Sequence, residues 1–149
     1  MSESKQQHVY LLLTAVHHNW SLMKAGDWNH TEWFVYSNGS YLCRTYYNPT
    51  WEALESLETE AASGQARGES VPWRVHTANG KMRAPSFRAL LDAMETDPWR
   101  PDGEVIHACD GDAWELRQFD MSGKTIRDSG RLGYIYGNAV LERITALLP

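Results

Sequence analysis

The stretch from Trp114 to Leu148 is the part of the chain that most restricts its fold. Residues 112–119 alternate apolar and polar side chains, as a half-buried strand does. An Asp-Met-Ser-Gly turn at 120–123 leads into a second strand. Asn138 is typical of a helix N-cap, and apolar side chains then recur at helical spacing to the end of the unit. A hairpin followed by an amphipathic helix favours an antiparallel sheet that is covered by helices.

The first third of the sequence indicates a strand and a hairpin. Residues 9–16 form a short apolar run with the composition of a buried strand. The polar stretch at 17–30, which contains three histidines, is expected to be a loop. Residues 31–36 and 41–47 are rich in β-branched and aromatic residues and flank an Asn-Gly pair. That pair predicts a type I′ turn, in which both central residues have positive φ.

The middle of the chain predicts helices joined by short strands. Asn48 and Pro49 are typical of a helix start, and this helix is expected to end at 61–64. An edge strand is expected at 71–76, a turn at the Asn-Gly pair 79–80, and a helix at 85–95. A short strand at 104–107 is a further possibility. The predicted class is α+β: an antiparallel sheet of four to six strands built from hairpins, with two or three helices packed mainly on one face.

Length and composition predict one globular domain over residues 1–149, with a flexible tail at 1–7 and a mobile loop at 63–70. The apolar run at 9–16 is far shorter than the roughly 20 residues that span a bilayer, and it lacks the flanks of a signal peptide. We therefore expect a cytoplasmic protein without membrane contact. Its two cysteines, Cys43 and Cys109, are expected to be reduced thiols.

The net charge of −5 argues against direct nucleic acid binding, because phosphate binding needs a positive field. The basic residues are dispersed, and their longest local concentration is Lys81, Arg83 and Arg88. The expected partner is therefore another protein. The sequence does not determine which protein this is, or the oligomeric state.

No motif in the chain predicts a cofactor, a metal or a catalytic residue. The cluster from His107 to Asp112 matches neither a zinc nor an EF-hand spacing. Gly130, Gly133 and Gly137 precede a helix, but they do not follow a nucleotide-binding pattern. Backbone packing explains these glycines better than a phosphate site does. No cysteine or serine lies in a nucleophile elbow, so the chain is expected to lack enzymatic activity, although a dispersed site stays open.

Two features point to a binding surface. The first is an acidic helix, whose carboxylates favour a basic protein surface although a solvated face also explains them. The second is a surplus of seven tryptophans, a residue type that is enriched at interface hot spots. Trp20 and Trp28 are further surface candidates in or near expected loops. The partner-binding residues predicted from both features are Glu52, Glu55, Glu58, Glu60, Trp51, Trp73 and Trp99.

The segments Cys109-Asp-Gly-Asp-Ala-Trp-Glu, Ser129-Gly130 and Gly133-Tyr-Ile-Tyr-Gly137, with the closing Leu-Leu-Pro, resemble a group of small uncharacterised bacterial proteins. In that group a similar C-terminal unit follows a Trp-containing hairpin like the one around Asn38-Gly39. The resemblance covers about the last forty residues and this hairpin. It implies a bacterial or phage origin and carries no activity, ligand or site residue.

The first functional hypothesis is a non-enzymatic protein-binding domain that masks a partner surface. Small acidic inhibitors, immunity proteins and anti-defence proteins of the anti-CRISPR type act in this way. One alternative is an enzyme or a binder of small molecules or nucleotides, with a dispersed site near the Gly130–Gly137 turn. The other is a carbohydrate-binding domain that uses surface tryptophans.

Overall fold

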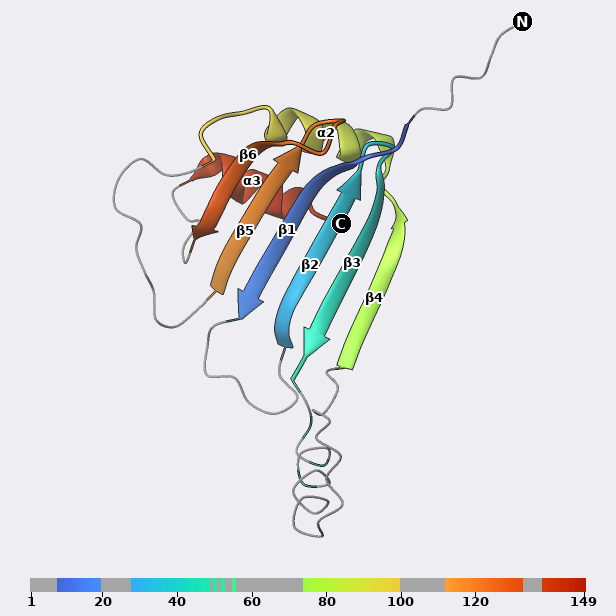
Figure 1. Cartoon of the computed structure of the whole chain (residues 1–149), viewed down its shortest axis with the longest axis vertical. Helices are drawn as coiled ribbons and strands as arrows, with labels where there is room; N and C mark the ends of the chain where they lie inside the picture. The colour runs from blue at the N-terminus through green and yellow to red at the C-terminus, as the bar shows by residue number, and fades with distance from the viewer. Residues whose placement is uncertain are drawn as a thin grey trace, which may run out of the picture.

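The computed structural model describes residues 8–19, 28–48, 50, 52, 55, 74–99, 112–132 and 138–149. In these ranges the chain forms one six-stranded sheet and two helices (Figure 1). The strands are β1 (Leu11–Asn19), β2 (Trp28–Tyr36), β3 (Ser40–Tyr47), β4 (Arg74–Lys81), β5 (Asp112–Phe119) and β6 (Thr125–Leu132). The helices are α2 (Ala84–Met94) and α3 (Ala139–Leu147).

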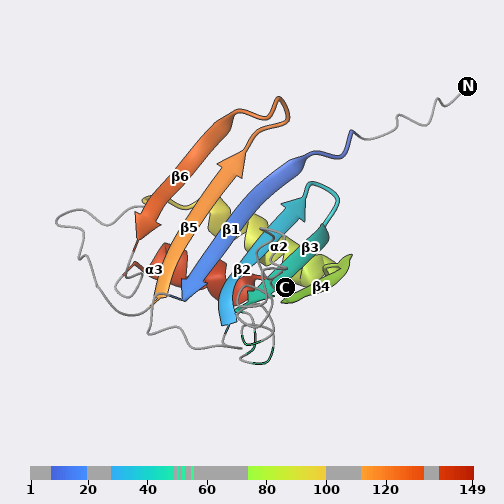
Figure 2. The same cartoon turned by 60° about the horizontal axis from the view of Figure 1, so that its bottom comes forward.

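The sheet is antiparallel throughout, in the order β4-β3-β2-β1-β5-β6 (Figure 2). β1 lies in the middle because β2 pairs with one of its sides and β5 with the other. β4 and β6 form the two edges. The predictions of the α+β class and of an antiparallel sheet are therefore confirmed.

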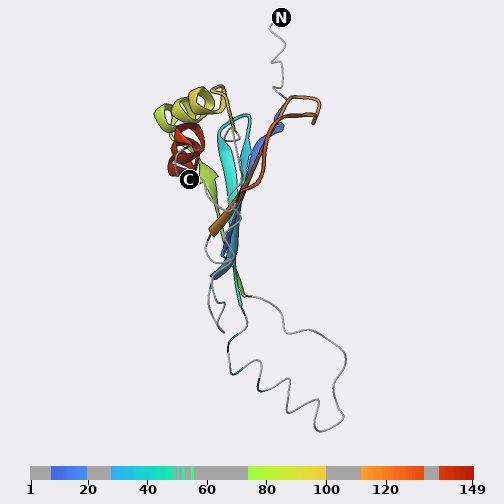
Figure 3. The ribbon, with the colours of Figure 1, turned by 90° about the vertical axis from the view of Figure 1, so that its left-hand side faces the viewer.

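Both described helices lie on the same side of the sheet, over the end where β1 begins (Figure 3). Alternate side chains of the strands face them and form the core with the apolar sides of the helices. Burying one such side chain stabilises the fold by roughly 1.5–3 kcal/mol. The core residues that are almost fully buried are Leu13, Val35, Leu90, Met94, Leu116, Leu132, Leu141 and Ile144.

The two helices form where the sequence predicts them. In α2 the apolar stripe places Leu90 and Met94 in the core, with neither side chain exposed. In α3 the side chain of Asn138 accepts a hydrogen bond of 3.1 Å from the backbone N–H of Leu141, as an N-cap does. Of the expected helix at 49–64 the structure describes residues 50, 52 and 55, and Glu52 and Glu55 are helical.

The β2–β3 hairpin forms as predicted, but the type I′ turn is wrong. In the described residues only glycines have positive φ, so Asn38 does not adopt the left-handed conformation that a type I′ turn requires. The N–H of Gly39 donates to the carbonyl of Tyr36 at 2.9 Å, and Gly39 has a φ of 84°. This geometry is a three-residue loop that ends in a glycine bulge. The side chain of Asn38 stabilises it by accepting a hydrogen bond from the N–H of Ser40 at 3.0 Å.

The Asn-Gly pair at 79–80 is not a turn, which corrects the prediction. Both residues belong to β4, where they pair with Leu42 and Tyr41 of β3. A Cβ atom on Gly80 would lie 3.0 Å from the hydroxyl oxygen of Tyr41, so the glycine leaves room for this ring. The local signal is overridden because a neighbouring strand pairs along the whole segment.

The loop expected at 17–30 is shorter than predicted. His17 and His18 continue β1, and His30 belongs to β2. The expected tail at 1–7, the mobile loop at 63–70 and the short strand at 104–107 lie outside the described residues. Within the described ranges, none of the helices has the length and apolar composition needed to cross a membrane.

Candidate functional site

The face of the sheet opposite α2 and α3, here called the open face, is lined mainly by polar and aromatic side chains. The helices lie on the other side (Figure 3). Side chains alternate between the two faces along each strand, and the register places those of the open face next to one another on neighbouring strands. Members of the open face are Thr14, Val16, His18, His30, Glu32, Phe34, Leu42, Arg44, Tyr46, Glu115, Arg117, Asp128 and Arg131.

Three rings, here called the ring row, cross three adjacent strands of the open face. His18 of β1 pairs with His30 of β2, which pairs with Tyr46 of β3. The rings of His30 and Tyr46 are stacked, with centroids 4.4 Å apart and planes 14° apart. The rings of His18 and His30 are tilted by 33°, with centroids 6.0 Å apart. The row is thus a continuous aromatic strip rather than three separate side chains.

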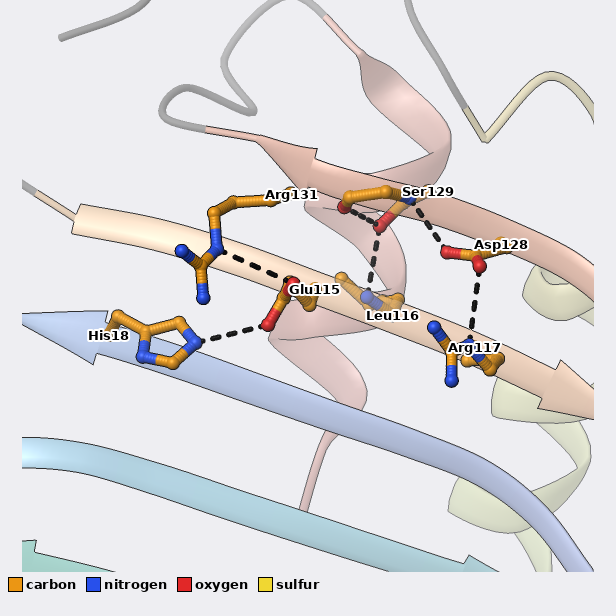
Figure 4. Close-up of polar contacts among 8 residues, drawn as sticks. His18, Glu115, Leu116, Arg117, Asp128, Ser129 and Arg131 are labelled. Atoms are coloured by element: carbon orange, nitrogen blue, oxygen red, sulfur yellow. Dashed lines mark hydrogen bonds and ion pairs between the residues drawn. The ribbon is translucent and has the colours of Figure 1, made fainter.

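Two carboxylates run beside the ring row. Glu115 accepts from Nε2 of His18 at 3.1 Å and forms an ion pair with Nε of Arg131 at 3.4 Å (Figure 4). Glu32 lies 3.6 Å from Nε2 of His30 and accepts a hydrogen bond from the hydroxyl of Tyr46 at 3.4 Å. Each carboxylate therefore fixes the orientation of a ring in the row.

Burial lowers the pKa of His30 below the ordinary histidine value. Glu32 opposes this effect by favouring the charged ring, while neighbouring His18 adds to it. His30 is accordingly neutral at neutral pH. A neutral imidazole can stack on Tyr46 without bringing an unbalanced charge into the row.

A second ion pair lies beside a β-bulge between β5 and β6. Nε of Arg117 lies 3.2 Å from a carboxylate oxygen of Asp128 (Figure 4). The register shifts here, so Ser129 is an extra residue between Asp128 and Gly130. The buried hydroxyl of Ser129 accepts from the N–H of Leu116 at 2.9 Å and donates to the carbonyl of Gly130 at 2.8 Å. The serine thus replaces a missing ladder bond and holds the bulge.

Two hollows in the described part of the chain lie at or below the lower end of the size range of ligand pockets. A shallow groove of about 180 Å³ runs over Thr14, Val16 and Gly130 on the open face. Ligand pockets are typically 300–1,000 Å³. A second hollow, of about 300 Å³, separates α2 from α3 and is lined by Asp92, Val140 and other helix residues. Glu115 already accepts from two donors, so it is poorly suited to act as a base.

On the helix side of the sheet, tryptophans pack against one another. The ring of Trp114 is stacked on His17 at 3.9 Å and on Trp33 at 5.6 Å. Trp28 meets His17 edge-on, with ring centroids 4.7 Å apart. Trp33 also donates from Nε1 to the carbonyl of Pro149 at 2.9 Å. These rings stabilise the sheet and the end of the chain, and Trp28, Trp33 and Trp114 are half-buried.

The predicted partner-binding residues are only partly placed. Glu52 and Glu55 are exposed. Trp99 is 4% exposed and belongs to the core, which corrects its expected surface position. It lies in the connection after α2, where local sequence gives no signal that distinguishes a core ring from a surface ring. Glu58, Glu60, Trp51, Trp73 and Trp20 lie outside the described residues.

The sequence prediction missed the ring row because it assigned the histidines to a loop. The available signal was the alternation, since His18 continues the series of Thr14 and Val16 and His30 precedes Glu32. Within the described ranges no three or more His, Cys, Asp or Glu side chains are grouped to hold a metal ion. Comparison with known proteins finds no matching family model, no matching curated protein and no matching solved structure.

Proposed function

We propose that this chain is a non-enzymatic protein-binding domain that masks a surface of a partner protein, with the open face as its docking surface. The observation that carries the proposal is the ring row of Tyr46, His30 and His18, held in place by Glu32 and Glu115. A binding surface whose side chains are already fixed loses less conformational entropy on association. Small inhibitors, immunity proteins and anti-defence proteins act by such masking.

The composition of the open face supports a protein partner. Tyrosine and arginine are enriched among the residues that carry most binding energy at protein interfaces. The open face carries Tyr46 on β3, together with Arg44, Arg117 and Arg131, and all three arginines are exposed. Such a surface resembles a hot spot of rings with a polar rim.

The charges of the open face support the same partner class. On β2, β3, β5 and β6 the three arginines of the open face lie opposite three carboxylates: Arg117 opposite Asp128, Arg131 opposite Glu115, and Arg44 opposite Glu32. A balanced surface attracts neither a polyanion nor a polycation strongly, whereas a nucleic acid site needs an excess of positive charge. Specificity would then come from shape and from the fixed hydrogen-bonding groups.

The acidic residues Glu52 and Glu55 supply a second element of this proposal. Both are exposed, and the net charge of the chain is −5. Long-range attraction to a basic region of the same partner would raise the rate of association. Contacts on the open face would then determine the rate at which the complex dissociates.

The test compares proteins captured from a bacterial lysate by the tagged chain and by two variants. Tyr46→Ala removes the outer ring of the ring row. Arg143→Ala is the matched control, because Arg143 is exposed on α3 on the other side of the sheet. A hot-spot tyrosine is worth about 2 kcal/mol, so Tyr46→Ala should weaken the complex by roughly 30-fold. Melting temperatures should show that both variants stay folded.

Three outcomes would contradict the proposal. If a captured protein binds Tyr46→Ala and the unsubstituted chain equally tightly, its binding does not depend on the ring row. A stoichiometric partner that is lost only with Arg143→Ala uses the helix side. A nucleotide, sugar or metal that raises the melting temperature, with no protein captured, would place the chain in one of the alternative functional classes.

A further inference from the structure

β4 is an exposed edge of the sheet. It pairs with β3 on one side, and all eight of its residues, Arg74–Lys81, are exposed (Figure 1). An exposed edge strand presents unpaired N–H and C=O groups, and another extended chain can pair with them. Many peptide-binding domains take up a strand in this way.

The two edges of the sheet differ in regularity. β4 pairs with β3 over its full length, from Arg74 to Lys81, without a register shift. β6 is shifted twice against β5, and Gly130 has a φ of 64° at its bulge. Bulges twist an edge and interrupt its row of hydrogen-bonding groups. Of the two edges, β4 therefore offers the unbroken template.

The register shows which backbone groups of β4 point outward. The N–H of Met82, just after β4, donates to the carbonyl of Gly39 at 2.8 Å, so even-numbered positions face β3. Because the direction alternates along an antiparallel strand, odd-numbered positions direct their N–H and C=O groups away from β3. The outward positions are Val75, Thr77, Asn79 and Lys81.

This end of the sheet is basic although the chain is acidic. Residues 40–48 and 74–88 contain no Asp or Glu, while the whole chain has a net charge of −5. Every Arg and Lys of these two ranges is exposed, and each of the strands β3 and β4 and the helix α2 contributes at least one. The basic residues of these ranges are Arg44, Arg74, Lys81, Arg83 and Arg88.

From these observations we infer that the β4 edge binds an extended acidic segment of a partner protein, which adds to the sheet as a seventh strand. Main-chain hydrogen bonds to the outward positions supply the pairing, and the surrounding Arg and Lys side chains select carboxylates. The inference deepens the proposed function, on which it rests for the existence of a protein partner. The side chains of Val75, Thr77, Asn79 and Lys81 lie on the open face, so the added strand would continue the docking surface.

A second copy of this chain fits the edge less well. An antiparallel copy of β4 would pair through the same outward positions and would bring its own Arg74 and Lys81, and no carboxylate, to an edge that is already basic. An acidic segment neutralises these charges, whereas a second basic strand adds to them. A nucleic acid would satisfy the positive charge but would leave the outward N–H and C=O groups without a strand to pair with.

The test measures binding of a synthetic peptide to the whole chain by fluorescence anisotropy. The probe is an acetylated eight-residue peptide that alternates valine with glutamate, and the control peptide carries lysine for glutamate. Thr77→Pro removes one outward N–H and no bond to β3, and proline is tolerated at such edge positions. Thr77→Ala is the matched control, since it changes the side chain and keeps the N–H. Circular dichroism checks that both variants fold.

The acidic peptide should bind, and Thr77→Pro should weaken it by about 10-fold while Thr77→Ala changes it by less than about 2-fold. Lys81→Glu should weaken the acidic peptide and strengthen the lysine peptide. Amide exchange by NMR should show new protection at Val75, Thr77 and Asn79. A peptide whose backbone N–H groups are methylated on one edge gives an independent check, because it needs no protein variant.

Several results would overturn the inference. Equal binding to Thr77→Pro and Thr77→Ala, or equal binding of a single-stranded oligonucleotide of the same charge, would mean a charged patch without strand addition. Protection of the outward amides without peptide, in a chain that sediments as a dimer, would assign the edge to a second copy. If the peptide fails to bind while Tyr46→Ala still loses a captured partner, the edge inference fails and the proposed function stands. If the peptide binds while capture does not depend on Tyr46, the proposed docking face fails instead.

Discussion

Replacing Ser129 by alanine should lower the free energy of unfolding by more than the net value of one ordinary hydrogen bond. Ser129 is fully buried, and its Oγ accepts from the N–H of Leu116 at 2.9 Å and donates to the carbonyl of Gly130 at 2.8 Å. Alanine fits the same space and keeps the backbone conformation available. It leaves the Leu116 N–H without its acceptor in a place that the surrounding core closes to water.

The expected cost follows from these two bonds. An orphaned buried donor costs about 1–3 kcal/mol, which exceeds the net value of an ordinary hydrogen bond. For a domain of this length, each kcal/mol shifts the melting temperature by roughly 2–4 °C. Ser129→Ala should therefore lower the free energy of unfolding by about 2 kcal/mol and the melting temperature by roughly 4–8 °C.

Urea unfolding followed by tryptophan fluorescence measures the effect. Ser122→Ala is the matched control, because this exposed hydroxyl donates to the carboxylate of Asp120 within the same turn. The control should change the free energy of unfolding by less than about 0.5 kcal/mol. A Ser129→Ala variant no less stable than Ser122→Ala would refute the reasoning, since the bulge would then not depend on the serine.

Three further predictions concern single side chains. Asn138→Ala should cost about 1 kcal/mol of stability by removing the cap on the N–H of Leu141, while Asn138→Asp should retain most of it, as thermal unfolding can show. Burial lowers the pKa of His30 below its ordinary 6.5, so its contribution to stability is complete above that value and is lost as the pH falls further. His30→Gln should therefore reduce the loss of stability between about pH 7.5 and about pH 5.5, and an unchanged loss would exclude His30 as its source. Burial also raises the pKa of the Cys43 thiol, so in a Cys109→Ser background Cys43 should react with iodoacetamide more slowly than free glutathione at about pH 8.

The sequence predicts those parts of the fold whose determinants are local. α2, the cap at Asn138 and the strand at 112–119 each follow from periodicity or from one capping side chain. The turn at Asp120 is another local case, because its carboxylate accepts hydrogen bonds from Ser122 and Lys124 and these bonds lower its pKa. The same local chemistry works wherever the segment lies in the fold.

The sequence does not predict the parts that depend on strand pairing. The Asn-Gly pair at 79–80 carries a turn signal, yet it stays extended because β3 pairs along it and the Tyr41 ring crosses Gly80. Similarly, His18 and His30 look like loop residues until their strands are placed side by side. The ring row is formed from three segments of the chain, so no single window of sequence contains it.

The two edges of the sheet show how one structure can favour a particular mode of binding. The bulge that Ser129 holds places Asp128 opposite Arg117 and Arg131 opposite Glu115, so each of these arginines of the open face is paired with a carboxylate. The same bulge makes β6 a poor template for another strand. β4 has no such interruption, and the side chains of its outward positions lie on the open face. A partner that docks on the ring row and extends a strand along β4 would therefore contact one continuous surface, while the bulged edge would disfavour pairing on the other side.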